Sequence, residues 1–180
     1  YANISSVNGI LIYNTQNSIS IDGNLFDGEI NSLATFREGY YWFIATSDLF
    51  GPQLHRTDGD VLLRITDNLQ SDAGQSIPPT IIGDRILFDS NGILAFDSDN
   101  MSLIELNSSL QNVGLESGAI THNGKLWFDC GVASYGFELC TSDGNSAWMH
   151  VDFAPGITSS SPSNLAIVGN NLLTLVSDPA

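Results

Sequence analysis

The residues best suited to covalent chemistry are Cys130 and Cys140, the only cysteines of this 180-residue chain. The sequence predicts that they lie on the two arms of one hairpin, around the stretch "GVASYGFEL". Paired arms at this spacing bring two Cβ atoms within the roughly 3.5 to 4.5 Å that a disulfide needs. We therefore expect a disulfide between them, with two buried free thiols as the alternative.

Acidic turns offer a second chemistry, because carboxylate and carbonyl oxygens are the ligands that Ca²⁺ prefers. The richest turns, "DGD" and "DSDN", supply these candidate calcium ligands: Asp58, Asp60, Asp97 and Asp99. Neither turn has the spacing of an EF-hand loop. The alternative, which we favour, is that the leading Asp accepts hydrogen bonds from N–H groups of its own turn. We expect no cofactor, with calcium as the weaker hypothesis.

Hydrolytic chemistry needs a nucleophile or a poised acid and base, and the sequence offers little of either. The three histidines, His55, His122 and His150, are far apart, and no G-x-S-x-G stretch is present. We expect His55 and His150 to be strand residues and His122 to sit in a hairpin turn. A propeller can still assemble a site from loops of several blades, so an enzyme stays an alternative.

The net charge limits which classes of partner we expect. The chain carries 20 Asp and Glu against 5 Lys and Arg, for a net charge of −15. Such a surface repels polyphosphates, so nucleic acid and anionic membranes are not expected as partners. No apolar run approaches the roughly 20 residues that span a bilayer, so membrane insertion is not expected either. The acidic composition fits an extracellular or cell-surface protein, and the initial Tyr leads us to expect a fragment.

A repeat of a little over forty residues organises the chain. The stretch "TDGD" at Thr57 aligns with "SDGN" at Ser142, 85 residues later, which corresponds to two periods. A shorter copy is "IDGN", and "DSDN" occupies the same place in between. The repeated turn motif comprises Asp22 and Gly23, Asp58 and Gly59, and Asp143 and Gly144.

Each repeat opens with an apolar hairpin whose tip contains Gly, and no stretch has a convincing helical period. Four short strands in about forty residues is the spacing of a propeller blade. The sequence thus predicts one all-β repeat domain over 1–180, a β-propeller segment of about four blades of antiparallel strands plus the start of a fifth. The expected blades are 1–32, 33–76, 77–117, 118–160 and a partial 161–180. A β-sandwich and a β-helix are the alternatives, and neither predicts this period.

Blades pack face to face, so apolar strand residues should form the core between them. The expected core residues are Tyr40, Trp42, Ile44, Ile86, Phe88, Leu126, Phe128 and Leu173.

The stretch "GFELCTSDGN", Gly136 to Asn145, resembles the signature G-x-E-L-W-x-x-D-G-T of the ELWxxDGT-repeat, hyalin-like proteins. Cys140 stands where that family has Trp, and Asn145 where it has Thr. The copy "GPQLHRTDGD" keeps Gly51, Leu54 and the Asp-Gly turn but has Gln and His at the Glu and Trp positions. The resemblance implies a β-propeller-like array in a secreted or surface-attached bacterial protein.

Together these features predict a non-enzymatic extracellular scaffold for adhesion, protein–protein interaction or surface assembly. One alternative is a carbohydrate-binding propeller, with aromatic rings such as Tyr13, Tyr135 and Trp148 against sugar faces. Another is a glycoside hydrolase or lyase with a site in a central channel. The expected partners are a protein or glycan at the cell surface, with self-association or missing chain at the open blade edge.

Overall fold

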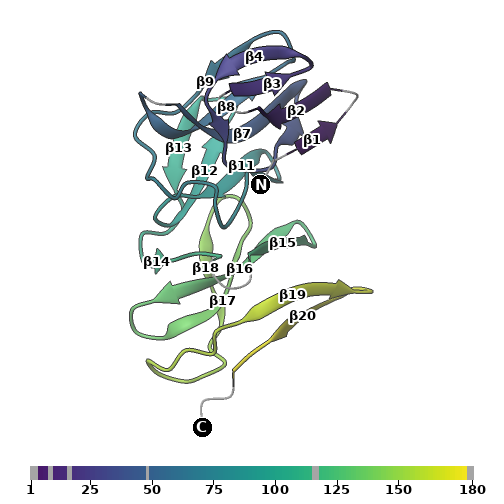
Figure 1. The fold of residues 1–180 in the computed structure, drawn as a ribbon. Helices are drawn as coiled ribbons and strands as arrows, with labels where there is room; N and C mark the ends of the chain where they lie inside the picture. The colour runs from purple at the N-terminus through teal and green to yellow at the C-terminus, as the bar shows by residue number, and fades with distance from the viewer. Residues whose placement is uncertain (1–3, 8–9, 16–17, 48, 115–117, 178–180) are drawn as a thin grey trace. The chain divides into compact units, whose positions relative to one another are not determined.

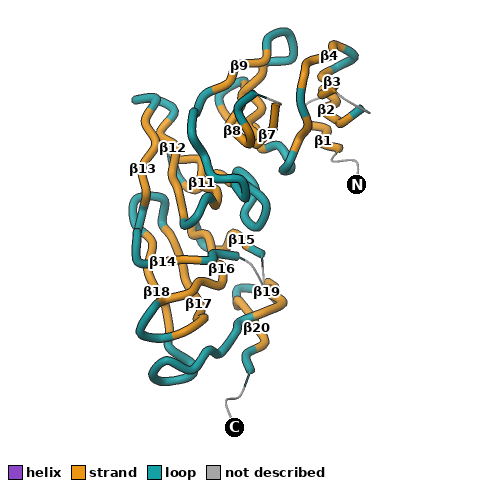
Figure 2. The backbone as a smooth tube through the Cα atoms, turned by 60° about the vertical axis from the view of Figure 1, so that its left-hand side comes forward, coloured by secondary structure: helices purple, strands orange, loops and turns teal. Residues whose placement is uncertain are grey.

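The computed structural model describes residues 4–7, 10–15, 18–47, 49–114 and 118–177. These residues form strands joined by turns and loops, without a helix (Figure 2). The part of the chain that is described therefore holds no helix of the length and hydrophobicity that crossing a membrane requires. The chain divides into two compact units, Tyr1–Ile81 and Ile82–Ala180.

The first unit contains two antiparallel sheets (Figure 1). The first sheet has the order β1-β2-β3-β4, with β1 Ile4–Val7, β2 Ile10–Asn14, β3 Ser18–Ile21 and β4 Asn24–Asp27. The second has the order β5-β7-β8-β9, with β6 also paired to β7; its strands are β5 Glu29–Ile30, β6 Thr35–Arg37, β7 Tyr40–Ser47, β8 Gly51–Thr57 and β9 Leu62–Arg64. Each sheet is thus built from strands that follow one another in the chain.

The remaining sheets continue the same pattern, and β10 spans the boundary between the two units. The third sheet has the order β10-β11-β12-β13, with β10 Thr80–Ile82, β11 Arg85–Asp89, β12 Ile93–Asp97 and β13 Ser102–Glu105. The fourth has the order β14-β16-β17-β18, with β15 also paired to β16; its strands are β14 Leu110–Gln111, β15 Ala119–His122, β16 Lys125–Val132, β17 Gly136–Ser142 and β18 Ala147–Val151. A two-stranded hairpin, β19 Ser163–Val168 and β20 Asn171–Leu175, follows (Figure 1).

The turn chemistry explains why these hairpins form. Asp22 and Gly23 have φ values of 47° and 90°, and they join β3 to β4 in a two-residue turn. Asn123 and Gly124, with φ values of 50° and 71°, do the same between β15 and β16. Positive φ at both positions is what a type I′ turn requires, and Asn, Asp and Gly adopt it at the lowest cost.

The predicted all-β fold is confirmed, and it is a β-propeller fold. Four sheets of four or five strands and one hairpin correspond to the expected four blades and the start of a fifth. Structurally equivalent residues also recur 85 positions apart. The indole N–H of Trp42 donates to the carbonyl oxygen of Arg37 at 3.3 Å, and that of Trp127 donates to the carbonyl oxygen of His122 at 3.2 Å. The division into blades at the expected boundaries stays a prediction.

Within the first unit, the two sheets pack against each other. Ile12, Ile19 and Ile21 of the first sheet form one buried cluster with Tyr41 and Phe43 of the second. Side chains alternate along a strand, so a central strand supplies both faces.

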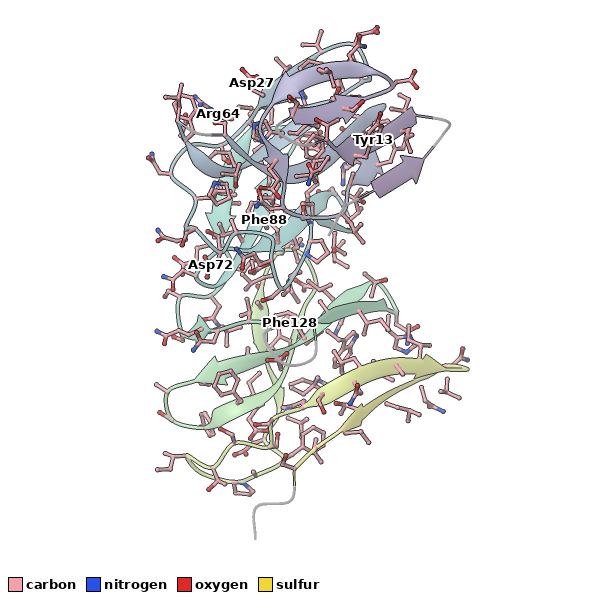
Figure 3. All side chains as sticks on the ribbon, in the orientation of Figure 1. Tyr13, Asp27, Arg64, Asp72, Phe88 and Phe128 are labelled. Carbon is pink, nitrogen blue, oxygen red and sulfur yellow. A yellow bond between two sulfur atoms is a disulfide. The ribbon has the colours of Figure 1, made fainter. Side chains whose placement is uncertain are left out.

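Most of the expected core residues are buried: Trp42, Ile44, Ile86, Phe88, Leu126 and Phe128. Phe88 and Phe128 are labelled in Figure 3. Tyr40 is half-buried, because it lies at the start of β7 with its ring against the guanidinium of Arg56. The prediction for Leu173 is wrong, since its side chain is 50% exposed. Leu173 is opposite Ala166 in the β19–β20 ladder, on the face of the hairpin that also carries Leu175.

Replacing Phe43 by Ala should lower the free energy of unfolding by about 3 to 5 kcal/mol, because it leaves a cavity between the first two sheets. Phe43 is fully buried, whereas Leu49 is 84% exposed in the loop before β8. Urea denaturation followed by tryptophan fluorescence measures the change. Leu49→Ala is the control and should change stability by less than about 0.5 kcal/mol; equal effects of the two variants would contradict the packing.

Candidate interaction surface

The acidic turns are held by their own leading carboxylates. Asp58 Oδ1 accepts hydrogen bonds from the N–H groups of Asp60 and Val61, each at 3.1 Å. Asp143 Oδ1 accepts from Asn145 and Ser146, each at 2.9 Å. These two turns lie 85 residues apart and have the same bonds, as the repeat requires.

The turn of the third sheet uses the same device. Asp97 Oδ1 accepts from the N–H groups of Asp99 and Asn100 at 3.0 and 3.1 Å. Its Oδ2 accepts from the Asn100 amide at 2.9 Å and lies 3.4 Å from the guanidinium of Arg85. These contacts favour the charged carboxylate and leave little of it for an external ligand.

The same bonds lower the pKa of all three leading carboxyls. The main cause at Asp58 is the Val61 N–H, at Asp143 the Asn145 N–H, and at Asp97 the side-chain amide of Asn100. The other two candidate calcium ligands, Asp60 and Asp99, are exposed in these turns. The described residues contain no group of three or more His, Cys, Asp or Glu placed to hold a metal. Calcium binding stays a hypothesis.

The cations are likewise engaged by neighbouring side chains. Arg56 lies 4.4 Å from the ring centroid of Tyr40, and Lys125 lies 5.0 Å from that of Trp148. The remaining cation contacts are Arg64 over Phe50, Arg64 with Asp67, Arg37 with Glu38, and Arg85 with Asp97. Basic groups thus cover aromatic rings or pair with carboxylates.

Each of the three histidines is held by its own local contact. His55 is on β8, where its Nδ1 lies 2.8 Å from the carbonyl oxygen of Gln53, and burial lowers its pKa below the ordinary 6.5. His122 ends β15 at the hairpin turn, and its Nε2 lies 3.1 Å from the carbonyl oxygen of Asn170. His150, on β18, packs edge-on against Trp127 at 4.7 Å.

A disulfide joins Cys130 to Cys140, with their Cα atoms 5.9 Å apart. In the β16–β17 ladder Cys130 is opposite Glu138, and Cys140 is opposite Phe128. The two cysteines are therefore diagonal neighbours on one face of the hairpin. The bond ties the two arms together ten residues apart in the chain.

Beside the disulfide, Glu138 fixes a long loop to the sheet. Its side chain is fully buried and accepts hydrogen bonds from the N–H of Phe153 at 3.0 Å and of Ser160 at 3.1 Å. The Ser160 hydroxyl donates a third bond at 2.6 Å. Since a buried carboxylate is costly unless it is fully hydrogen-bonded, these three donors explain how it is tolerated. The same residue occupies the Glu position of the repeat signature.

The loop and the hairpin together form an open groove of about 260 Å³. Its lining residues are Gln111, Asn112, Gly131, Val132, Ala133, Gly136, Phe137, Ile157 and Ser159. The Ser159 hydroxyl accepts a hydrogen bond from the Phe137 N–H at 3.0 Å, which joins the loop to β17 along the groove. Ile157 is 82% exposed at its rim.

Among the described residues, the groove is lined by amide, hydroxyl and hydrocarbon side chains, which suit binding. Amides and the hydroxyl can donate and accept hydrogen bonds, and Phe137 with Ile157 offers apolar contact. Sequence reasoning missed these residues, since they come from three separated segments. Part of the groove could have been found from the stretch "GFEL". Its Gly136 lines the groove, and its Glu138 anchors the loop that forms one wall.

Comparison with known proteins establishes the fold. No protein-family model matches the chain, and no curated protein matches it. Its structure is similar to the crystal structure of BamB from Moraxella catarrhalis, with a TM-score of 0.52 at 14% sequence identity. The match covers 95% of this chain and 53% of the BamB chain, so this chain spans about half the length of that protein. At this identity the likeness shows a common fold, and function must be argued from the site.

Replacing Asp58, Asp97 and Asp143 together by Asn should weaken the acid dependence of stability. Folding lowers the pKa of the three carboxyls, so their contribution is present above the ordinary 3.8 and is lost as pH falls through the lowered folded pKa. Asn keeps an oxygen that can accept the turn bonds but does not titrate. Urea midpoints from about pH 6 to about pH 2.5 should fall less steeply for the variant. Parallel curves for the variant and the wild type would show that the three carboxyls do not contribute to the acid dependence of stability.

Replacing Glu138 by Ala should loosen the 153–160 loop, because its carboxylate no longer accepts the hydrogen bonds from the Phe153 N–H, the Ser160 N–H and the Ser160 hydroxyl. The expected cost is about 1 to 3 kcal/mol in total, because the N–H and hydroxyl of Ser160 keep the carbonyl oxygen of Phe137 as an acceptor. Hydrogen exchange resolved by NMR should show faster exchange at the Phe153 and Ser160 amides. Glu138→Gln, which keeps one acceptor oxygen, should give an intermediate rate; unchanged exchange in both variants would contradict the anchor.

Proposed function

We propose that this chain is a non-enzymatic β-propeller scaffold that binds another protein through the groove between the β16–β17 hairpin and the 153–160 loop. The observation that carries the proposal is the chemistry of this groove. Its walls offer neutral hydrogen-bonding groups beside apolar side chains, and the loop that forms one wall is anchored by the fully buried Glu138. Such a preformed surface suits binding, because an anchored loop loses little conformational entropy when a partner binds.

The ligand best suited to this groove is an extended peptide segment. Strand β14 lies at one end of its sheet order, and its Gln111 lines the groove. An extended chain beside such an edge can pair with backbone groups while one side chain enters the apolar part. The net charge of −15 favours a partner segment that carries basic residues next to this contact.

The setting that fits this proposal is extracellular or at the cell surface. The Cys130–Cys140 disulfide supports it, because disulfides persist in oxidising compartments. Membership of the ELWxxDGT-repeat proteins is part of the same proposal. Its support is the "GFELCTSDGN" stretch, in which the Glu anchors a loop and the Asp caps its turn.

Glycan binding is the second candidate, and one observation favours it. Tyr135 is 40% exposed in the turn that joins β16 to β17, beside groove residues Ala133 and Gly136. An aromatic ring next to amide groups can stack on a sugar face while the amides bind hydroxyl groups. A glycan array on which wild type binds and Tyr135→Ala does not would favour this candidate over the peptide.

Selection of peptides from a displayed random library tests the proposed function. Peptides selected on the wild-type chain should lose at least about tenfold in affinity for Ile157→Asp, since a carboxylate then replaces the apolar rim, a loss of about 1.4 kcal/mol. Leu49→Asp is the matched control, because Leu49 is 84% exposed against 82% for Ile157 and does not line the groove. Selected peptides that bind both variants as well as wild type would refute the groove as the binding site.

A further inference from the structure

The groove contains one aromatic side chain, Phe137, on a fixed backbone. Phe137 is opposite Gly131 in the β16–β17 ladder, and both residues line the groove. A Cβ added at Gly131 would lie 3.6 and 3.7 Å from two ring carbons of Phe137, so the missing side chain lets the ring rest close to β16. The Phe137 N–H donates to the Ser159 hydroxyl at 3.0 Å, and its carbonyl oxygen accepts from the Ser160 N–H at 3.0 Å. The half-buried Phe137 is therefore held in place before a partner binds.

Other aromatic rings of this chain are covered by its own cations. These contacts are Arg64 over Phe50 at 3.5 Å, Arg56 over Tyr40 at 4.4 Å and Lys125 over Trp148 at 5.0 Å. The two other arginines, Arg37 and Arg85, pair with Glu38 and Asp97. Each of the five Lys and Arg side chains, all of which the structure describes, thus has a contact other than Phe137. A cation that covers the ring of Phe137 must come from another molecule.

The neighbouring residues of the groove suit the rest of an arginine side chain. Val132 and Ile157 are apolar and can pack against its methylene stem, since long cationic side chains bury their stems along apolar surface. The exposed amides of Gln111 and Asn112 carry oxygens that can accept hydrogen bonds from the guanidinium. A guanidinium is planar, stacks on aromatic faces and is more weakly hydrated than the ammonium of lysine. Arginine therefore fits this groove better than lysine.

We propose that the groove binds an arginine side chain from an extended segment of a partner protein, with the guanidinium against the ring of Phe137. This inference rests on the proposed function, because it names the side chain that enters the groove. The net charge of −15 supports it, since an acidic protein attracts a cationic segment. A cation over an aromatic face adds a contact that a neutral side chain of the same length lacks.

Titration of the full chain with matched peptides tests the arginine site. The probes are blocked heptapeptides Gly-Ser-Val-X-Val-Ser-Gly, in which X is arginine, its neutral analogue citrulline, or leucine. Amide chemical shifts in NMR give the affinity and the site, in about 150 mM NaCl to screen long-range attraction. The arginine peptide should bind at least about fivefold more tightly than the citrulline and leucine peptides. Its shifts should include the amides of Gly131, Phe137 and Ile157.

Replacing Phe137 by Leu tests the role of the ring, because Leu keeps an apolar side chain without an aromatic face. The preference for arginine over citrulline should fall to within about twofold, while the leucine peptide should bind about as well as before. Phe153→Leu is the matched control, since Phe153 is 42% exposed and is not one of the lining residues. It should keep the preference. The amide spectrum of each variant shows that it is folded.

The outcomes separate this inference from the proposed function. Equal affinity of wild type for the three peptides, with shifts in the groove, overturns the arginine site and leaves peptide binding in place. A Phe137→Leu variant that keeps the full preference also overturns it, because the guanidinium then lies elsewhere. Absence of groove shifts with the arginine peptide overturns it as well. The proposed function falls only if the displayed library also yields no peptide that depends on the groove.

Discussion

A single sheet of four short strands cannot bury its own apolar side chains, so the first two sheets of this chain depend on packing face to face. The cluster that joins Ile12, Ile19 and Ile21 to Tyr41 and Phe43 is this interaction in its clearest form. Because a central strand such as β7 is buried on both faces, it reads as the continuous apolar run "YYWFIA" rather than as an alternating one.

The polar groups are arranged around this packing. Leading aspartates cap the turns between the third and fourth strands of the second, third and fourth sheets, and basic side chains cover aromatic rings at the sheet surface. Glu138 fixes the 153–160 loop from a buried position. These groups hold turns and loops around the packed sheets.

Local features were readable from the sequence because their causes are local. The hairpin tips follow from Gly and Asn at positive φ, the turn caps from an Asp two residues before the N–H that it binds, and the disulfide from two cysteines on adjoining arms. The period of the repeat then predicted that these hairpins form the blades of a β-propeller. Features that join distant segments were not readable: the groove needs Gln111, Phe137 and Ile157 together, and only the fold brings them there.

Leu173 shows the limit of the repeat as a guide. Its position in β20 corresponds to that of the buried Trp42 in β7, so the pattern predicts burial for both. Burial also depends on the side chains that pack over a residue, which the residue's own position in a strand does not encode. The same limit applies to function, since the fold shared with BamB at 14% identity does not specify a ligand.

The most direct test of face-to-face packing is a set of nuclear Overhauser effects between side chains of the first two sheets. With Ile δ-methyl groups and Phe and Tyr rings labelled, the account predicts cross-peaks from Ile12 and Ile19 to the ring protons of Tyr41 and Phe43. Such cross-peaks report protons within about 5 Å, close to the distance at which apolar side chains touch. Absence of all of them in a folded sample, with the cross-strand peaks inside each sheet present, would contradict the account.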